Sequence, residues 1–396
     1  MSLLFIKILF IPLYLVGFLI PKNKKMWVFG SVSGNKYSDN SKYLYNYISG
    51  NPECKAVWLT KDKKIIGRLK HEGKCCYYFY SLKGIYSAIV AKYIVLSYSY
   101  DDVSIFCYLF SVRSKIIQLF HGTPLKKLEI EKNKPRSKIA IRKFLRLYMG
   151  KNYDLIIAAS DLAAKKMDIY FKVGRDKFAV TGYPRNDALF AVEDDVFLSQ
   201  LKSKVNFSKT ILYLPTYRGY SSNNVNFCLS GCYGFNPERL NRFLEIHDAI
   251  FLIKLHFRDC EKAQNIISNL NNSSRIQFIR DEQIGDDIYP LLAHTDILVT
   301  DYSSVYFDYL LLNKPIVFFD YDLEEYESQD RGFYFDYGEV TPGQKVKNWD
   351  DLEFAMREIL NDFDEYGRER EKINHLFNTY GGGDNSERVY REILKC

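Results

Sequence analysis

The 396-residue sequence lacks the motifs of several large enzyme classes. It contains neither an HExxH pattern nor a Walker A loop, so zinc-dependent hydrolysis and ATP use find no support in it. The excess of positive charge is also small, because 55 Lys and Arg stand against 48 Asp and Glu, for a net charge of +7. Since no nucleic-acid-binding motif or domain-sized basic stripe accompanies this charge, the sequence does not indicate a nucleic-acid-binding protein.

Cysteine is too sparse and too scattered to indicate a metal centre or a disulfide framework. Of the eight cysteines, only Cys228 and Cys232 have a spacing that resembles a metal-ligand pair, and no second pair or suitable histidine accompanies them. A structural zinc site is therefore not expected, and we propose no metal-ligating residue. The absence of paired cysteines fits a reducing cytosol.

The sequence has one long apolar run, at its N-terminus. Residues 3–20 are almost all apolar, with interruptions at Lys7 and Pro12, and Lys22, Lys24 and Lys25 follow. The run lies at the lower length limit for a membrane-spanning helix, so three alternatives stay open: a span, an anchor in the membrane interface, and an element buried in the fold. We expect residues 1–21 to be a membrane-associating leader.

A dense cluster of basic residues lies further along the chain, at residues 126–151. It is either a solvated helix face or a surface that binds phosphate or the membrane.

Strand-like and helix-like segments alternate after this leader, which predicts an α/β protein with parallel sheets covered on both faces. A chain of this length normally divides into two domains. We predict two Rossmann-like domains that face a central cleft, an N-terminal one over residues 22–190 and a C-terminal one over residues 191–396, with a polar boundary near residues 188–208. Their predicted strands occupy residues 26–31, 55–60, 92–97, 115–122, 154–160 and 177–184, then 210–218, 251–256, 275–281, 296–301 and 314–320.

The most informative segment is Asp296 to Asp308, DILVTDYSSVYFD. The run Ile297–Val299 predicts a buried strand, and Ser303 and Ser304 then open a helix-like segment. Two hydroxyls, free backbone N–H groups and the positive end of a helix dipole can together bind a phosphate. An ordinary capped helix has the same pattern, so this segment alone does not decide the function.

Other motifs precede and follow this segment in a fixed order. They are WVFGSVSGNKYSDNSKYLY (27–45), HGTPLKKL (121–128), GYPRND (182–187), YLPTYR (213–218), KLH (254–256), KPIVFFDYDLEEY (314–326) and RGFYFD (331–336). The series closely resembles the CDP-glycerol glycerophosphotransferase family, the polymerases and primases of teichoic acids and teichoic-acid-like capsules. The resemblance covers most of the chain and implies the GT-B architecture.

His121 follows a predicted strand, and an imidazole is a natural general base for a hydroxyl nucleophile. An isolated His-Gly is more often a turn, but the resemblance implies that this histidine deprotonates the acceptor. The same motif supplies four further candidate substrate-binding residues, Gly122, Thr123, Pro124 and Leu125.

The resemblance places the remaining candidates on the donor. Arg185 is expected to contact the phosphates or glycerol, or else to form a salt bridge with Asp187 or another interdomain carboxylate. A lysine and a histidine on one side of an extended segment are expected to neutralise the diphosphate, and His256 is the second catalytic candidate. The full donor-side set is Arg185, Pro215, Thr216, Arg218, Lys254, His256, Ser303, Ser304 and Asp308, with Arg331 as a further candidate.

The reaction implied is transfer of glycerol phosphate, or a related polyol phosphate, from CDP-glycerol to a hydroxyl of a membrane-linked acceptor or growing polymer, with release of CMP. No cofactor is expected to be required; Mg²⁺ is compatible with Asp301 and Asp308 but not indicated. The expected partners are the donor, a lipid- or polymer-linked acceptor and the membrane surface, at the cytoplasmic face of a bacterial membrane. The alternative is a GT-B glycosyltransferase that uses a nucleotide sugar.

Overall fold

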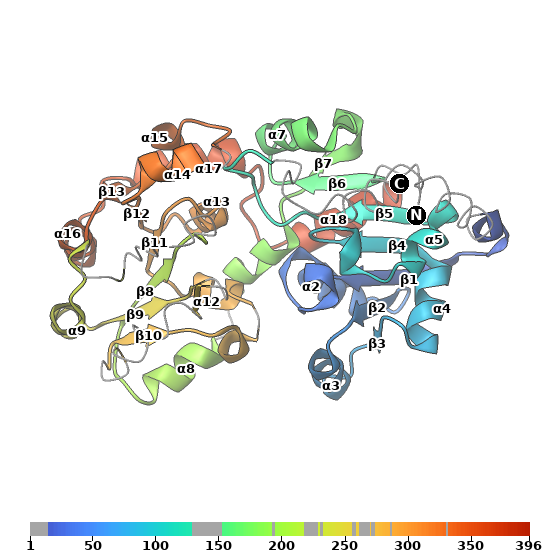
Figure 1. The fold of residues 1–396 in the computed structure, drawn as a ribbon, viewed down its shortest axis with the longest axis horizontal. Coiled ribbons are helices and arrows are strands. Elements are labelled where there is room, and N and C mark those ends of the chain that lie inside the picture. The colour runs from blue at the N-terminus through green and yellow to red at the C-terminus, as the bar shows by residue number, and fades with distance from the viewer. Residues whose placement is uncertain are drawn as a thin grey trace. The chain divides into compact units, whose positions relative to one another are not determined.

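The computed structural model describes residues 15–128, 153–191, 195–217, 229, 233–255, 259–260, 270, 274–285, 287–329 and 332–396. The chain forms two compact units (Figure 1). Unit 1 comprises Met1–Gly122, Glu129–Asp187 and Gly382–Cys396, and unit 2 comprises Thr123–Leu128 and Ala188–Gly381. The units differ from the predicted domains in two places: a short segment after Gly122 joins unit 2, and the C-terminal residues return to unit 1.

Unit 1 is built on a parallel sheet with the strand order β3-β2-β1-β4-β5-β6-β7 in the described residues. The strands are apolar because helices cover both faces, as is usual in parallel α/β sheets. Its core includes Trp27, Phe29, Trp58, Val95 and Ile117, all at most 1% exposed. The strands are β1 (Asn23–Gly30), β2 (Lys55–Thr60), β3 (Cys76–Tyr78), β4 (Ala91–Leu96), β5 (Lys115–Gln118), β6 (Leu155–Ala158) and β7 (Phe178–Val180).

Short polar residues start several helices of unit 1. The side chains of Asp62, Ser81 and Ser160 each accept a hydrogen bond from a free amide in the first turn of the next helix. The described helices are α2 (Asp39–Ser49), α3 (Lys63–His71), α4 (Leu82–Val90), α5 (Phe106–Leu109), α7 (Asp161–Phe171) and α18 (Asn385–Lys395), with 3-10 turns η1 (Val32–Gly34), η2 (Tyr100–Asp102), η3 (Ser111–Arg113), η4 (Arg175–Lys177) and η5 (Pro184–Phe190).

The C-terminal helix α18 belongs to unit 1 because Asp187 holds its first residues. One carboxylate oxygen of Asp187 accepts hydrogen bonds from the backbone and side-chain nitrogens of Asn385, and the other accepts from the Ser386 amide, at 2.8–2.9 Å. Val389 and Ile393 of α18 are fully buried in the core of unit 1. Sequence alone did not indicate this return of the chain.

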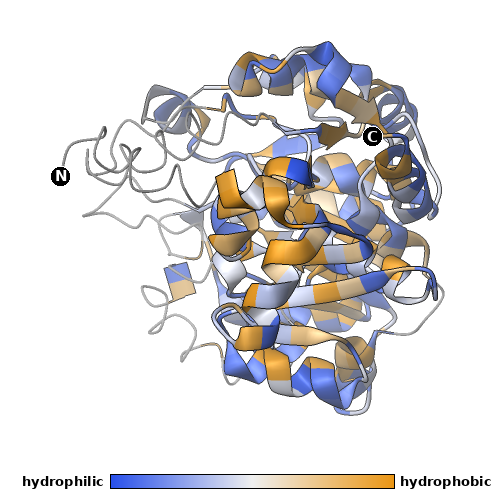
Figure 2. Cartoon of the chain, turned by 90° about the vertical axis from the view of Figure 1, so that its right-hand side faces the viewer, coloured by the Kyte–Doolittle hydropathy of each residue, from blue (hydrophilic) through white to orange (hydrophobic). Residues whose placement is uncertain are grey.

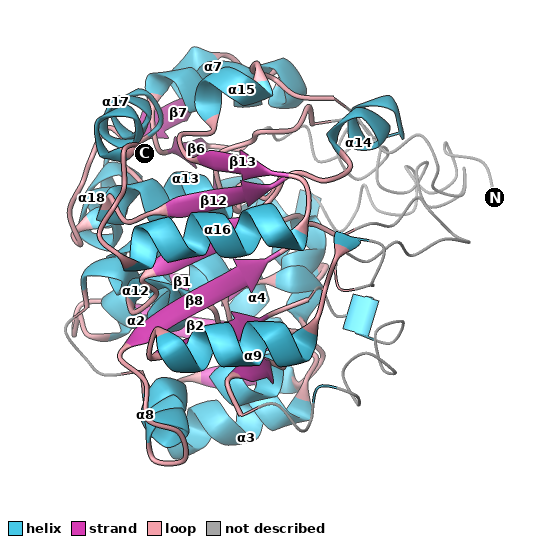
Figure 3. Ribbon diagram, turned by 90° about the vertical axis from the view of Figure 1, so that its left-hand side faces the viewer, coloured by secondary structure: helices cyan, strands magenta, loops and turns pink. Residues whose placement is uncertain are grey.

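Unit 2 has a second parallel sheet, with the order β10-β9-β8-β11-β12-β13 in its described part. Figure 3 shows α9 and α16 in front of this sheet, and both helices contribute buried apolar side chains to its core. Its elements are α8 (Val196–Lys202), β8 (Lys209–Leu214), α9 (Pro237–Ile246), β9 (Ala249–Ile253), β10 (Ile276–Phe278), η8 (Asp281–Ile284), α12 (Tyr289–Ala293), β11 (Ile297–Thr300), α13 (Val305–Tyr309), η9 (Leu310–Leu312), β12 (Ile316–Phe319), α14 (Leu323–Gln329), α15 (Tyr337–Val340), β13 (Gln344–Val346), α16 (Trp349–Leu360) and α17 (Gly367–Phe377).

The prediction of a mixed α/β fold with two parallel sheets is confirmed. Each predicted strand corresponds to an observed one, although several end earlier than expected. The two strands that the sequence did not reveal, β3 and β13, are three residues long and lie at sheet edges. An edge strand has one neighbour and needs no continuous apolar run, so its pattern is weak.

Most of the predicted leader, residues 1–14, lies outside the described residues. Residues 15–19 are helical, and Leu15 and Leu19 are 57% and 82% exposed. Within the described part of the chain, no helix combines the length and the apolar character that crossing a membrane requires.

Candidate active site

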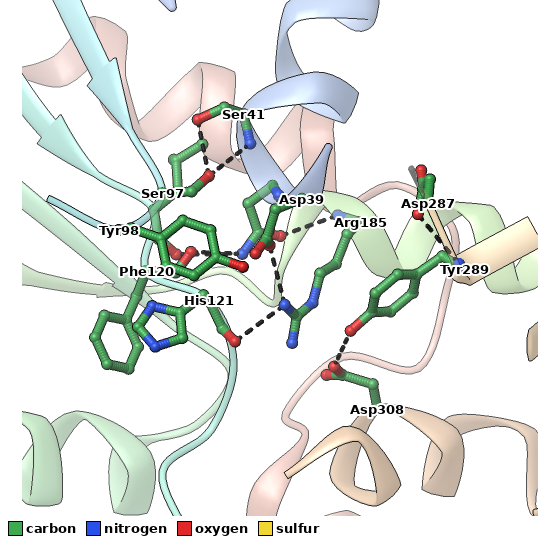
Figure 4. Close-up of polar contacts among 12 residues, drawn as sticks. Asp39, Ser41, Ser97, Tyr98, Phe120, His121, Arg185, Asp287, Tyr289 and Asp308 are labelled. Carbon is green, nitrogen blue, oxygen red and sulfur yellow. Dashed lines mark hydrogen bonds and ion pairs between the residues drawn. The ribbon is translucent and has the colours of Figure 1, made fainter. Parts of the chain in front are cut away.

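His121 follows strand β5 of unit 1 in a tightly held turn (Figure 4). Phe120 adopts a positive φ of 58°, a conformation that non-glycine residues seldom adopt. Its amide donates to Gln118 Oε1 at 3.0 Å, and its carbonyl accepts from Asn40 Nδ2 at 3.0 Å. Gly122 then has φ of 118°, which favours glycine at this position. The backbone on both sides of His121 is therefore fixed.

Arg185, which follows strand β7, stabilises this turn. Its Nη1 donates to the carbonyl oxygen of His121 at 3.0 Å and forms a salt bridge with Asp39 Oδ1 at 2.9 Å. Both charged side chains are at most 7% exposed, and a buried ion pair of this kind is costly to break. Of the alternatives for Arg185, the structure has a salt bridge, but with Asp39 rather than Asp187.

The imidazole of His121 lies flat against the ring of Tyr98, which follows strand β4. The ring centroids are 4.5 Å apart and the planes differ by 9°. Figure 4 shows the hydroxyl of Tyr98 directed toward the Asp39 carboxylate. Burial of this hydroxyl, followed by the charge of the carboxylate, raises the pKa of Tyr98 well above its usual value, so the hydroxyl keeps its proton.

The start of helix α2 connects these segments. Asp39 has a positive φ of 63°, and Asn40 Oδ1 accepts from the Arg185 amide at 3.1 Å. The amide of the next residue, Ser41, donates to Ser97 Oγ at 2.9 Å, and the hydroxyls of these two serines are 2.8 Å apart. Sequence reasoning missed Asp39, Asn40 and Tyr98; the first two lie in the recognised motif 27–45, but nothing in their spacing indicated this role.

Asp102 fills a nest of backbone amides beside the same strand ends. Its carboxylate accepts from the amides of Ser33, Ser97, Tyr98 and Ser99 at 2.7–3.1 Å. Burial raises the pKa of Asp102 to about 6, and the amide hydrogen bonds act in the opposite direction. Such nests bind phosphate in many proteins, but an internal carboxylate occupies this one. This nest is therefore not the candidate anion site.

In unit 2, Asp301 joins the ends of β8 and β11. Both of its carboxylate oxygens accept from the Thr216 amide, at 2.8 and 3.0 Å, and Oδ1 also accepts from the Tyr302 amide at 2.6 Å. Asp301 has no exposed surface. The structure thus brings the predicted residues Pro215 and Thr216 beside the segment that carries Ser303 and Ser304, and it uses Asp301 to do so.

Ser303 and Ser304 are half-buried at the start of α13. The side chain of Ser304 forms no capping hydrogen bond, and Ser303 Oγ is 3.5 Å from the Val305 amide, a weak contact. The predicted helix is shorter than expected, since α13 spans five residues and continues as the 3-10 turn η9. The hydroxyls and local amides, rather than a long helix dipole, are the groups available to an anion here.

Asp308, predicted either to contact the glycerol or ribose or to orient the two serines, has no exposed surface. Tyr289 donates a hydrogen bond to its Oδ2 at 2.6 Å (Figure 4). A carboxylate buried in this way stabilises α13 through its hydrogen bond to Tyr289 and does not face a ligand. Asp301 is buried as well, and the described residues contain no cluster of three or more His, Cys, Asp and Glu side chains suited to a metal ion.

Lys254 follows β9, and its ammonium forms a salt bridge with Asp281 Oδ1 at 2.7 Å. Both side chains are about one-fifth exposed. The pairing reduces the net positive charge that Lys254 brings to the strand ends. Three other predicted residues, Arg218, His256 and Arg331, lie outside the described residues, as does the basic cluster beyond Leu128.

The HGTPLKKL motif is divided between the units after Gly122. Thr123, Pro124 and Leu125 are buried in unit 2, and the next residues pair with the segment after residue 331. The Lys127 amide donates to the Gly332 carbonyl at 3.0 Å, and the Tyr334 amide donates to the Leu125 carbonyl at 2.8 Å. The second part of the motif is therefore held within unit 2 by the segment that begins at Gly332.

The sequence and the fold of this chain are similar to those of known proteins. The model of one family, described as CDP-Glycerol:Poly(glycerophosphate) glycerophosphotransferase, matches residues 13–395. The chain belongs to this family. It is accordingly a glycerophosphotransferase, and the resemblance inferred from the ordered motifs is confirmed.

Two curated relatives of this glycerophosphotransferase extend over nearly its whole length. It is 29% identical over 394 residues to a teichoic acid glycerol-phosphate transferase of Staphylococcus aureus, covering 94% of each chain. It is 28% identical over 410 residues to a teichoic acid poly(glycerol phosphate) polymerase of Bacillus spizizenii, covering 99% of this chain and 97% of the relative. The solved structure of the wall teichoic acid polymerase TagF has the same fold, with a TM-score of 0.73, 22% identity and coverage of 94% of this chain and 89% of that one.

Proposed function

We propose that this chain transfers glycerol phosphate from CDP-glycerol to a hydroxyl group of a membrane-linked acceptor or growing teichoic-acid-like polymer. The observation that carries the proposal is the full-length family match together with a histidine held rigidly at a strand end. The acceptor oxygen forms a bond to the β-phosphorus of the donor, the bond from that phosphorus to the bridging oxygen breaks, and CMP leaves. Positioning and charge neutralisation dominate such transfers.

In this reaction His121 acts as the general base. Its imidazole accepts the proton of the acceptor hydroxyl as that oxygen attacks phosphorus. The fixed backbone on either side of it supports this role, because a base must lie within hydrogen-bonding reach of the proton that it removes. Arg185, nearly buried and engaged by Asp39, serves here to hold the turn rather than to bind phosphate.

The donor diphosphate binds in unit 2 at Ser303, Ser304 and the end of β8. The half-buried hydroxyls support this assignment, as does the rigid backbone that Asp301 imposes on Thr216. Ligands of parallel α/β sheets bind beyond the carboxyl ends of the strands, where these residues lie. Lys254 and His256 neutralise charge on the departing CMP, and the two parallel-sheet units correspond to a GT-B-like architecture.

We place the protein at the cytoplasmic face of the bacterial membrane. Exposed apolar side chains of unit 1 support a peripheral attachment: Leu19 is 82% and Leu82 of α4 is 88% exposed. Figure 2, viewed from the side on which α4 and α5 lie in Figure 1, shows hydrophobic stretches on the helices that face the reader. Lys22, Lys24 and Lys25, which follow Leu19 in the sequence, would favour anionic lipid.

Incubation with radiolabelled CDP-glycerol and a synthetic lipid-linked acceptor tests the function. Release of CMP with labelled lipid product is expected, and turnover of a UDP-sugar without CMP release would instead indicate a glycosyltransferase. The mass of the product distinguishes single transfer from polymerisation, and parallel reactions with CDP-ribitol test the polyol.

Flotation with anionic vesicles tests the membrane contact. A variant lacking residues 1–21 is expected to lose flotation but to keep its affinity for CDP-glycerol, because every proposed donor residue lies beyond the leader. Equal flotation of both forms would transfer the role to the basic cluster at residues 126–151. Misfolding of the shortened form would mean that the leader belongs to the core of unit 1.

A further inference from the structure

The side chains around His121 form a closed ring of contacts within unit 1 (Figure 4). The imidazole stacks on Tyr98, the hydroxyl of Tyr98 is directed toward Asp39, and Asp39 pairs with Arg185 at 2.9 Å. Arg185 then returns to the start of the ring by donating to the carbonyl oxygen of His121 at 3.0 Å. The four residues come from four separate segments of the chain, so the fold itself assembles the ring.

We propose that Tyr98, held by Asp39 and Arg185, is a positioning residue that sets the plane of the His121 imidazole for proton removal from the acceptor. The inference rests on the proposed role of His121 as the base. Rotation of an imidazole about its last side-chain torsion is broad when nothing packs against it. A parallel neighbour at 4.5 Å with a 9° angle between planes restricts that rotation.

The backbone of the ring indicates that its geometry is specifically maintained. Asp39 and Phe120, the residue before His121, both have positive φ without being glycine. Such conformations persist only where the surroundings over-determine them, and they concentrate at functional sites. Here the surroundings are the hydrogen bonds of Asn40 to the Phe120 carbonyl and to the Arg185 amide.

Tyr98 also differs from the tyrosines that only fill the core of unit 1. Tyr45 and Tyr183 have no exposed surface, whereas Tyr98 is 39% exposed while its hydroxyl is directed toward Asp39. A side chain anchored at one end and accessible along its ring can brace the imidazole without closing access to it. This arrangement fits a support for a reactive group better than it fits a packing residue.

The test compares Tyr98→Leu and Tyr98→Phe in the full-length protein, with CMP release from CDP-glycerol and a synthetic lipid-linked acceptor as the assay. Tyr98→Leu removes the stacked ring and is expected to lower kcat by about 10²-fold, the scale of a misoriented catalytic group, with the KM for CDP-glycerol unchanged. Tyr98→Phe keeps the ring and is expected to retain most of kcat. Tyr80→Leu, which removes a 52% exposed tyrosine of the same unit, is the matched control and should leave kcat unchanged.

A double variant separates failure of this proposal from failure of the proposed function. If Tyr98 acts through the imidazole, adding Tyr98→Leu to His121→Ala should cause no further loss. A further loss of the same size as in the wild-type background would overturn the proposal, as would a wild-type kcat in Tyr98→Leu. Normal turnover in His121→Ala would instead overturn the role of the base. If Tyr98→Leu does not fold, as judged by circular dichroism, Tyr98→Phe decides the matter: a kcat as low as that of His121→Ala would contradict positioning by the ring.

Discussion

The two units hold their candidate residues by different means. In unit 1, the His121 turn depends on side chains that are distant in sequence, with the Asp39–Arg185 ion pair at its centre. In unit 2, the Ser303–Ser304 segment depends on one buried carboxylate, because Asp301 accepts from the backbone amides of Thr216 and Tyr302. We infer that the first region is fixed by contacts between side chains, whereas the second is fixed by a side chain that binds the backbone of the strand ends.

The largest effect is expected from His121→Ala, because it removes the reacting group that the unit 1 network supports. Loss of a general base lowers the rate by about 10²–10⁴-fold, while CDP-glycerol affinity should stay near that of the wild type. Turnover at saturating acceptor and donor binding by calorimetry provide the two measurements. Near-wild-type turnover would remove His121 from the mechanism.

Asp39→Ala tests whether the ion pair is the centre of unit 1. The substitution leaves the guanidinium of Arg185 buried without its carboxylate, and breaking a buried pair in this way costs about 3–5 kcal/mol. Denaturant unfolding should therefore show a large loss of stability.

The control for Asp39→Ala is Glu53→Ala, which breaks an exposed salt bridge of the same unit. In that salt bridge, Lys25 Nζ lies 2.8 Å from Glu53 Oε2. Exposed pairs are screened by water and salt, so no measurable change is expected from the control. Equal stabilities of the two variants would show that the Asp39–Arg185 pair does not hold the turn.

Ser303→Ala combined with Ser304→Ala tests whether the two hydroxyls of unit 2 bind the donor diphosphate. Two hydroxyl donors to the diphosphate are lost, each worth roughly 1.5–3 kcal/mol when the partner is charged, so the KM for CDP-glycerol should rise and kcat/KM should fall. Stability should change little, since neither side chain makes a strong internal hydrogen bond. An unchanged affinity in calorimetry would place the phosphate site elsewhere.

Sequence alone located both regions but not their internal contacts. Strand ends and ordered motifs predicted where His121, Thr216 and Ser303 lie, because apolar runs and their polar ends are local patterns. The pairing of Asp39 with Arg185 spans 146 positions, and the Tyr98 stack joins the ends of two neighbouring strands. Such contacts depend on how the sheet is assembled, and no spacing in the chain records them.

The burial of Asp308 was missed for a related reason. Its position one turn after Ser304 indicated a carboxylate that contacts the glycerol or ribose or orients the serines, but the helical segment turns that side chain into the core of unit 2, where Tyr289 donates a hydrogen bond to it. A helix of five residues offers too little periodicity to decide which face is buried.

The smallest effect among these variants is expected from Tyr289→Phe, which removes a hydroxyl that supports α13 without touching a ligand. The fully buried Asp308 carboxylate then loses a donor 2.6 Å away, at a cost of about 1–3 kcal/mol in stability. Urea unfolding measures this loss, and the KM for CDP-glycerol should change less than in the Ser303–Ser304 double variant. Adding Asp308→Asn should recover part of the stability, because the buried group is then neutral and its unmet demand for donors is smaller. A stability equal to that of the wild type in Tyr289→Phe would mean that the hydrogen bond does not support α13, and the distinction between the two units would then rest on Asp301 alone.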